Sequence, residues 1–185
     1  MKKANDMLVL ITGIFIFLIS YAFDEHVNLF FNESRFAFFD VLLSVITNFG
    51  FVVVAMLIIP SFILYRKGKN HIFLLWLGFI ISFVLNFIAK LIVHRPRPID
   101  TFAYPFSDIL SYSFPSTHSI VVFSLLPILA KYLPKQKYFW IVFAFLVAFS
   151  RIYFGFHFLS DVVFGAFAGY FIGNYLLHLA GKRKS

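Results

Sequence analysis

Long hydrophobic segments alternate with short polar ones along almost the whole chain. Six of these segments have about the length that a helix needs to cross a hydrocarbon core of ~30 Å. They span Met7–Phe23, Val41–Tyr65, His71–Val93, Ser116–Leu133, Tyr138–Phe156 and Asp161–Leu179. The pattern therefore predicts an all-α, polytopic bundle of six transmembrane helices, formed by a single domain over residues 1–185.

The segments between and before these helices suggest further features. Glu25–Asp40 is moderately amphipathic, which favours a position along the membrane interface. His94–Phe114 contains prolines and is too irregular to cross the bilayer. The first segment has a second interpretation as a signal peptide, with Lys2 and Lys3 before it and small residues at Ser20–Ala22 for cleavage. An uncleaved first helix is the simpler interpretation.

The composition supports a membrane location. Of the 185 residues, 61% are hydrophobic and only 13% are charged, and the mean hydropathy is +0.89. A soluble domain of this size has no room to bury so much apolar surface, so the bilayer is expected to be its solvent. The chain has no cysteine, which excludes disulfides and thiol chemistry.

The net charge of +8 would suggest nucleic acid in a soluble protein, but here the positions of the charges matter more. In the six-helix arrangement, eleven of the 16 basic residues fall on one side: Lys2, Lys3, Arg66, Lys67, Lys69, Lys131, Lys135, Lys137, Lys182, Arg183 and Lys184. The positive-inside rule then predicts that both termini are cytoplasmic. No nucleic-acid partner is predicted.

A first polar cluster stands at the end of the third hydrophobic segment. It contains Lys90, His94, Arg95 and Arg97, and the prolines beside the arginines should end the helix and hold the chain extended. Lysine supplies a point charge and arginine a planar fork that can grip two phosphate oxygens. Basic residues at helix ends also commonly extend to lipid headgroups, so this cluster alone does not establish a phosphate site.

A second cluster, Phe114–Ser119, opens the fourth segment. Ser116 is predicted to be the N-cap, and the free amides of the first helical turn attract anions. His118 would lie beside an anion bound there, where it could act as a general acid. A capped helix start with an interfacial histidine is the simpler alternative.

The third cluster lies in Ser150–Asp161. His157 and Asp161 are four residues apart and would share a face of a helix. A carboxylate on one ring nitrogen would leave the other nitrogen free to attack. An Arg151–Asp161 pair at a turn, with an uninvolved histidine, is the alternative.

Taken together, the clusters favour catalysis. The six-helix arrangement places all three on the outer side, and they supply cations, two histidines and an aspartate. These are the groups needed for phosphoryl transfer through a phosphohistidine. Neither a carboxylate or histidine cluster at metal-ligand spacing nor a P-loop is present, so no cofactor is predicted.

The three clusters resemble the signature of the type 2 phosphatidic acid phosphatase superfamily, the membrane lipid phosphatases related to vanadium haloperoxidases. The K-x6-R-P motif is matched by Lys90, Arg97 and Pro98, and the S-R-x5-H-x3-D motif by Ser150, Arg151, His157 and Asp161. The P-S-G-H motif is matched by Pro115, Ser116 and His118, with Thr117 in place of the glycine. A backbone amide remains at Thr117, so phosphate binding there is still expected.

The resemblance implies metal-independent removal of phosphate from a membrane lipid at the outer face. It also implies His157 as nucleophile, Asp161 as its orienting group and His118 as acid and base. Phosphate would be bound by Lys90, Arg97, Ser116, Thr117 and Arg151. His94 and Arg95 are possible headgroup contacts, and Asn86 is expected to join helices or to hold Lys90.

Several alternatives stay open. The same phosphohistidine could serve a lipid phosphotransferase, and the same cations a transporter or a non-catalytic scaffold. Undecaprenyl diphosphate, phosphatidylglycerophosphate and phosphatidic acid all carry a terminal phosphate that suits the predicted site. The oligomeric state cannot be deduced from the sequence.

Overall fold

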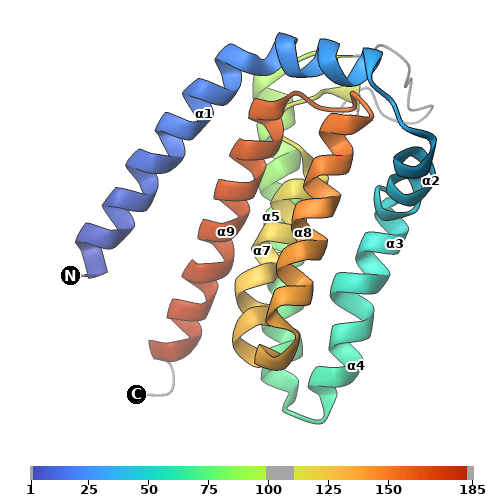
Figure 1. Ribbon diagram of the computed structural model, residues 1–185. Coiled ribbons are helices and arrows are strands. Elements are labelled where there is room, and N and C mark those ends of the chain that lie inside the picture. Colours follow the sequence, from blue (N-terminus) through green and yellow to red (C-terminus); the bar gives the residue numbers. More distant parts are fainter. Residues whose placement is uncertain (1, 99–110, 183–185) are drawn as a thin grey trace.

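The computed structural model describes residues 2–98 and 111–182, without the side chains of residues 2–6 and 8. Every element in these ranges is helical (Figure 1). In chain order the elements are α1 (Lys2–Glu33), α2 (Ala37–Ile46), α3 (Phe49–Val53), the π-helical turn η1 (Val54–Ile58), α4 (Ile59–Tyr65), α5 (Lys69–Val93), α7 (Thr117–Tyr132), the 3₁₀ turn η2 (Pro134–Gln136), α8 (Lys137–Tyr153) and α9 (Leu159–Lys182).

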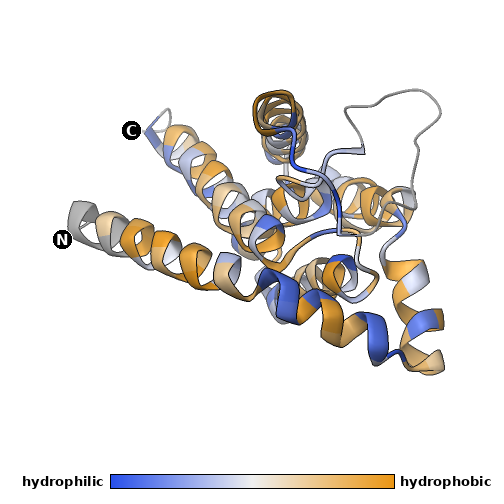
Figure 2. Ribbon diagram, turned by 90° about the horizontal axis from the view of Figure 1, so that it is seen from above, coloured by the Kyte–Doolittle hydropathy of each residue, from blue (hydrophilic) through white to orange (hydrophobic). Residues whose placement is uncertain are grey.

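Helix α1 is longer than the sequence pattern predicted. The expected end at Phe23 is wrong, because the helix continues through the amphipathic stretch to Glu33. Figure 1 shows α1 rising from the N-terminus and then turning across the end of the bundle. Seen from that end, hydrophilic residues gather in this crossing part of α1 and in the connecting segments (Figure 2).

The second predicted helix is broken rather than continuous. Its first part, α2, meets the Phe49–Tyr65 part at an angle of 57°. The break falls at Thr47 and Asn48, and the Asn48 Oδ1 accepts a hydrogen bond of 3.0 Å from the Phe51 amide to cap α3. Further along, the π-helical turn η1 precedes Pro60, whose ring nitrogen has no proton to donate to the helix.

Helix α7 forms the centre of the bundle. All residues from His118 to Leu129 are buried, so this helix is surrounded by protein on every side. Helix α9 packs against it backbone to backbone. A Cβ added at Gly169 would collide with the Ile120 carbonyl oxygen and lie 2.9 Å from the Ser124 amide nitrogen, so this close approach requires glycine.

Three of the described helices are long and apolar enough to cross a membrane, namely Val9–Glu33, Lys69–Val93 and Leu159–Lys182. The bent pair Ala37–Ile46 and Phe49–Tyr65 brings the number of candidate spans to four if it forms one broken span. The chain is therefore an all-α, multi-pass membrane protein.

The helix ends that carry the polar clusters meet at one end of the bundle. Helices α5 and α8 finish there, and α7 and α9 begin there (Figure 1). Helix α5 ends at Val93, and its C-cap residue His94 has a left-handed φ of 52° just before the prolines. The clusters are therefore brought together by helix packing and not by proximity in the sequence.

Candidate active site

The structure brings the catalytic candidates from four elements to this end of the bundle. Lys90 belongs to the last turn of α5, His118 to the first turn of α7 and Arg151 to the last turn of α8. His157 lies in the α8–α9 connection, and Asp161 lies in the first turn of α9. All five side chains are buried, which is expensive for charged groups unless they have partners.

His157 and Asp161 face each other, although not on one continuous helix. The Nδ1 atom of His157 is 3.7 Å from the Asp161 Oδ2. That oxygen accepts a hydrogen bond from the Phe158 amide at 2.9 Å and another from the Ser113 hydroxyl. At this distance Nδ1 makes no hydrogen bond to the carboxylate or to any other described group, and the ring forms one hydrogen bond with the backbone of Ser113. A carboxylate beside Nδ1 favours a proton on that nitrogen and a lone pair on Nε2.

Burial lowers the pKa of His157 well below its usual value. The positive charges of Arg151, Arg97 and Lys90 act in the same direction. The imidazole is therefore neutral in the substrate-free protein, and a neutral ring has the lone pair that a nucleophile requires.

His118 is oriented by the bend between α2 and α3. Its ring forms a hydrogen bond with the backbone of Thr47, and the Phe49 ring lies edge-on at 5.0 Å between centroids. The buried Nε2 of His118 has no hydrogen-bond partner among the described residues. Arg151, His157 and Arg97 all interact electrostatically with this ring. One ring nitrogen is thus anchored and the other is available for proton transfer.

The three predicted phosphate-binding cations make hydrogen bonds to neutral oxygens. Lys90 Nζ donates to the Tyr112 carbonyl and, at 3.5 Å, to the Ser113 carbonyl. Arg97 donates to the Ser111 and Phe156 carbonyls at 2.9 and 2.8 Å.

Arg151 donates to the Thr47 hydroxyl at 2.5 Å, and its guanidinium lies 4.4 Å from the centroid of the Phe156 ring. The bend at Thr47 therefore contacts both Arg151 and His118.

Ser116 and Thr117 open α7 as predicted, with different contacts. Ser116 occupies the N-cap position, but its side chain makes no capping hydrogen bond. Its amide donates to the Asp161 carbonyl at 3.2 Å, which joins α7 to α9. The Thr117 hydroxyl accepts a hydrogen bond of 2.9 Å from the Asn86 side chain, so Asn86 joins α5 to α7.

Three contributors and the ion pairs of a fourth were not predicted from the sequence. Arg95, a possible headgroup contact, bonds to Asp24 and Asp161. Asp24, Thr47 and Ser113 belong to none of the three clusters. The prolines around Arg95 were a signal of a fixed position, whereas nothing local distinguishes Thr47 or Ser113.

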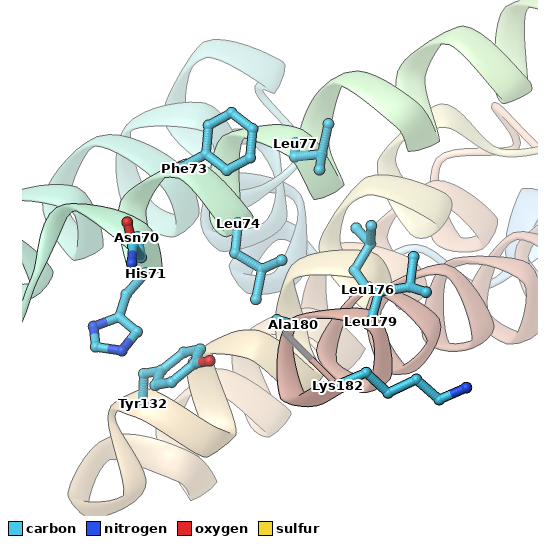
Figure 3. A pocket seen from close by; sticks show the side chains of 10 residues that line it. All are labelled: Asn70, His71, Phe73, Leu74, Leu77, Tyr132, Leu176, Leu179, Ala180 and Lys182. Carbon is cyan, nitrogen blue, oxygen red and sulfur yellow. The ribbon is translucent and has the colours of Figure 1, made fainter. Parts of the chain in front are cut away.

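A cavity of about 640 Å³ lies elsewhere, between the start of α5 and the ends of α7 and α9 (Figure 3). It is lined by Asn70, His71, Phe73, Leu74, Leu77, Tyr132, Leu176, Leu179, Ala180 and Lys182. These helix ends are at the opposite end of the bundle from the catalytic candidates. Within residues 2–98 and 111–182, no three His, Asp or Glu side chains are grouped to hold a metal ion.

Buried histidines beside several cations supply groups for nucleophilic and acid–base chemistry on an anion. The family model described as the PAP2 superfamily matches residues 71–185. The chain therefore belongs to the PAP2 superfamily and is a membrane lipid phosphatase.

Two curated relatives cover different shares of the chain. An undecaprenyl-diphosphatase of Sulfolobus acidocaldarius is 26% identical over 190 residues, which cover 97% of this chain and 89% of that protein. The bacitracin transport permease protein BcrC of Bacillus licheniformis is 30% identical over 109 residues, which cover 56% of this chain and 54% of that protein.

Two crystal structures share the fold. A transmembrane PAP2-type phosphatidylglycerolphosphate phosphatase from Bacillus subtilis has a TM-score of 0.73 and 26% identity, covering 93% of this chain and 96% of that one. LpxE of Aquifex aeolicus has a TM-score of 0.69 and 24% identity, covering 84% and 94% of the two chains.

Proposed function

We propose that this lipid phosphatase removes the terminal phosphate of a membrane lipid phosphate or diphosphate, without a metal, through a phosphohistidine on His157. The observation that carries the proposal is the pair of buried histidines. His157 has Asp161 beside Nδ1, and His118 has an anchored ring with an unpartnered Nε2. Arg151 and Arg97 interact electrostatically with both rings, so the cations surround the same space.

The proposed reaction has two steps. In the first, the Nε2 lone pair of His157 forms a bond to phosphorus while the bond from phosphorus to the leaving oxygen breaks. His118 gives its proton to that oxygen. Lys90, Arg97 and Arg151 stabilise the charge on the other phosphate oxygens, and the first-turn amides of α7 contribute at the same place.

In the second step, water replaces the lipid. His118 takes a proton from water, the water oxygen attacks phosphorus, and the phosphorus–nitrogen bond breaks to release inorganic phosphate. By microscopic reversibility, the group that was the acid in the first step is the base in the second. Asp161 stabilises the positive charge of the substituted imidazole in both steps.

Two substrates deserve the first tests. Undecaprenyl diphosphate is supported by the named activity of the Sulfolobus relative, which aligns over nearly the whole chain. Phosphatidylglycerophosphate is supported by the named activity of the Bacillus subtilis structure. Phosphatidic acid completes the panel, because it offers the same terminal phosphate with a different lipid.

The experiment is phosphate release from the three lipids by detergent-solubilised protein in the presence of EDTA. His157→Gln is compared with His26→Gln, since His26 is exposed on α1 and distant in sequence from the three clusters. We expect EDTA-resistant release, reduced at least ~10³-fold by His157→Gln and unchanged by His26→Gln. Release by the wild type that stops with EDTA, or that survives His157→Gln, would overturn the mechanism.

A phosphotransferase is the second candidate, because the chemistry of the first step is the same. It predicts little phosphate release until a hydroxyl acceptor is supplied, followed by transfer of labelled phosphate to that acceptor. A transporter predicts lipid-phosphate binding that survives His157→Gln and no release under any condition.

We further propose that six segments cross the membrane, with both termini cytoplasmic and the site on the extracytoplasmic side. The support is the basic residues at the end of the bundle opposite the site, among them Lys67, Lys135 and Lys182. Lys2, Lys3, Arg183 and Lys184 of the same predicted set lie outside the described side chains.

Because the chain has no cysteine, single cysteines report the orientation directly. Lys135→Cys and Glu33→Cys lie at opposite ends of the bundle, and both positions are exposed. A membrane-impermeant maleimide applied to intact cells should label Glu33→Cys and spare Lys135→Cys. The reverse pattern would invert the proposed orientation.

A further inference from the structure

Arg95 joins two buried carboxylates that come from distant parts of the chain. One guanidinium nitrogen donates to the Asp161 Oδ1 at 2.8 Å, and the other donates to the Asp24 Oδ2 at 2.7 Å. The exposed fractions of the side chains are 19% for Arg95, 4% for Asp24 and 0% for Asp161. We call this arrangement the ion-pair chain.

Further contacts fix the ion-pair chain. Asp24 accepts hydrogen bonds from the Ser160 amide at 2.8 Å and from the Ser160 hydroxyl at 2.5 Å. The hydroxyl of Ser160 also accepts a bond of 2.7 Å from Arg95. The Phe158 ring lies 4.0 Å from the guanidinium carbon. These groups hold α1 against the start of α9, next to the catalytic candidates.

The geometry gives the two carboxylate oxygens of Asp161 different tasks. Oδ1 is held by Arg95, whereas Oδ2 accepts hydrogen bonds from Ser113 and Phe158 and faces the His157 Nδ1 at 3.7 Å, a charge contact without a hydrogen bond. Asp24 supplies a second negative charge that offsets the guanidinium. Without that charge, the cation would act on Asp161 alone and weaken it as a partner for an imidazole that becomes positive during the reaction.

We propose that Arg95 and Asp24 are positioning residues: Arg95 fixes the Asp161 carboxylate against His157, and Asp24 offsets the charge of the guanidinium, so that the carboxylate keeps its attraction for the imidazole. This inference rests on the proposed phosphohistidine mechanism. It also assigns a function to α1, which would otherwise serve only as a membrane span.

The electrostatic surroundings of His157 make the effect specific. The charged and titratable groups that act on the ring come from every neighbouring element: Lys90 of α5, Arg97 after α5, His118 of α7, Arg151 of α8 and Asp161 of α9. Asp161 is the one carboxylate in this described set. A substitution of Arg95 or Asp24 that alters the charge distribution of Asp161 should therefore change the electrostatic field at the His157 ring, with no other carboxylate of this set to mask the effect.

The test compares Asp24→Asn, Arg95→Gln and the double variant with the wild type. Glu25→Gln is the matched control, because Glu25 is the exposed neighbour of Asp24 on α1. Arg95→Gln leaves two buried carboxylates without their cation and is the variant most at risk of not folding. Asp24→Asn keeps the shape of the side chain, and the double variant removes both charges together.

The readout that a purely structural role would not move is the ring Nδ1–H proton resonance of His157, recorded by NMR at fixed pH and assigned with His157→Gln. Arg95→Gln should strengthen Asp161 as an acceptor and shift the resonance downfield. Asp24→Asn should weaken Asp161 and shift the resonance upfield. The double variant should return towards the wild-type position, and Glu25→Gln should not move it.

Kinetics provide the second readout. Asp24→Asn should lower kcat on the order of tenfold with KM within about twofold, because the described contacts of Asp24 are with Arg95 and Ser160 and its proposed action on His157 is indirect. In the Arg95→Gln background, Asp24→Asn should lower kcat much less, because Asp24 acts on Asp161 through the Arg95 guanidinium. Resonance shifts in one direction for both single variants, or additive losses of kcat, would overturn the proposal. Absence of phosphate release by the wild type would instead sink the proposed function, and the NMR comparison would still decide the ion-pair chain.

Discussion

Thr117, which replaces the usual glycine of the second motif, is expected to stabilise the start of α7 more than it affects the chemistry. Its hydroxyl accepts a hydrogen bond of 2.9 Å from Asn86, whose side chain is 3% exposed and whose Oδ1 has no partner among the described residues. Thr117→Gly removes this acceptor and leaves the whole Asn86 amide group unpaired in a buried position.

The expected loss follows from two contributions. A buried amide left without its partner costs about 1–3 kcal/mol, and glycine in a helix adds up to about 1 kcal/mol. A total of about 1–4 kcal/mol lowers the Tm of a chain of this size by roughly 2–16 °C. The backbone amide remains at position 117, so kcat should stay within about tenfold of the wild type.

Thermal unfolding in detergent, followed by circular dichroism, measures the effect against two comparisons. Thr117→Ser keeps the hydroxyl and should unfold near the wild-type temperature. In an Asn86→Leu background, Thr117→Gly should cost only the glycine contribution of about 1 kcal/mol. An equal loss of Tm with and without Asn86 would refute the reasoning, because the hydrogen bond would then contribute nothing.

Three further predictions concern the site and its supports. Because burial lowers the pKa of His157, its ring should take up a proton in an NMR titration only well below the usual pH of about 6.5. The unfolded chain takes up this proton near pH ~6.5, so this group makes folding less favourable as the pH falls below that value. Gly169→Ala drives a Cβ into the Ile120 carbonyl and should lower both Tm and kcat, whereas Gly181→Ala, with nothing within 4 Å, should change neither. Tyr153→Phe removes the hydroxyl that bonds to the start of α2 and should lower Tm by an amount equivalent to about 1–2 kcal/mol, with a smaller effect on KM than on Tm.

The convergence of the three clusters was predictable, because each cluster stands at a helix end. Successive membrane helices run in opposite directions, which brings these particular ends to the same side of the bundle. The pairing of His157 with Asp161 was predicted from their spacing. The reason given was incomplete, since α9 starts at Leu159 and His157 precedes it. A turn that leads into a helix can bring residues i and i+4 together as a helix does.

The supports of the site were not predictable in the same way. Asp24 contacts Ser160 across 136 positions of sequence, and Arg151 contacts Thr47 across 104. Hydrophobic periodicity identifies which segments are helices, but it does not show which polar residue of one helix will meet a given residue of another. The continuation of α1 past Phe23 was missed because the hydrophobic pattern becomes amphipathic there. Residues 24–33 contain no glycine or proline that would end the helix.

The backbone contact between α7 and α9 has a consequence for motion. At Gly169 the backbone of α9 lies directly against the Ile120 carbonyl, and the Ser116 amide bonds to Asp161, so few side chains separate the two helices there. They carry His118 and Asp161, so we expect the proposed acid and the proposed orienting carboxylate to move together. In the proposed mechanism we therefore expect the widening that admits a lipid to come from the outer helices, and α1 is tied to Asp161 through Arg95. The proposed mechanism thus couples entry of the lipid to the alignment of His157.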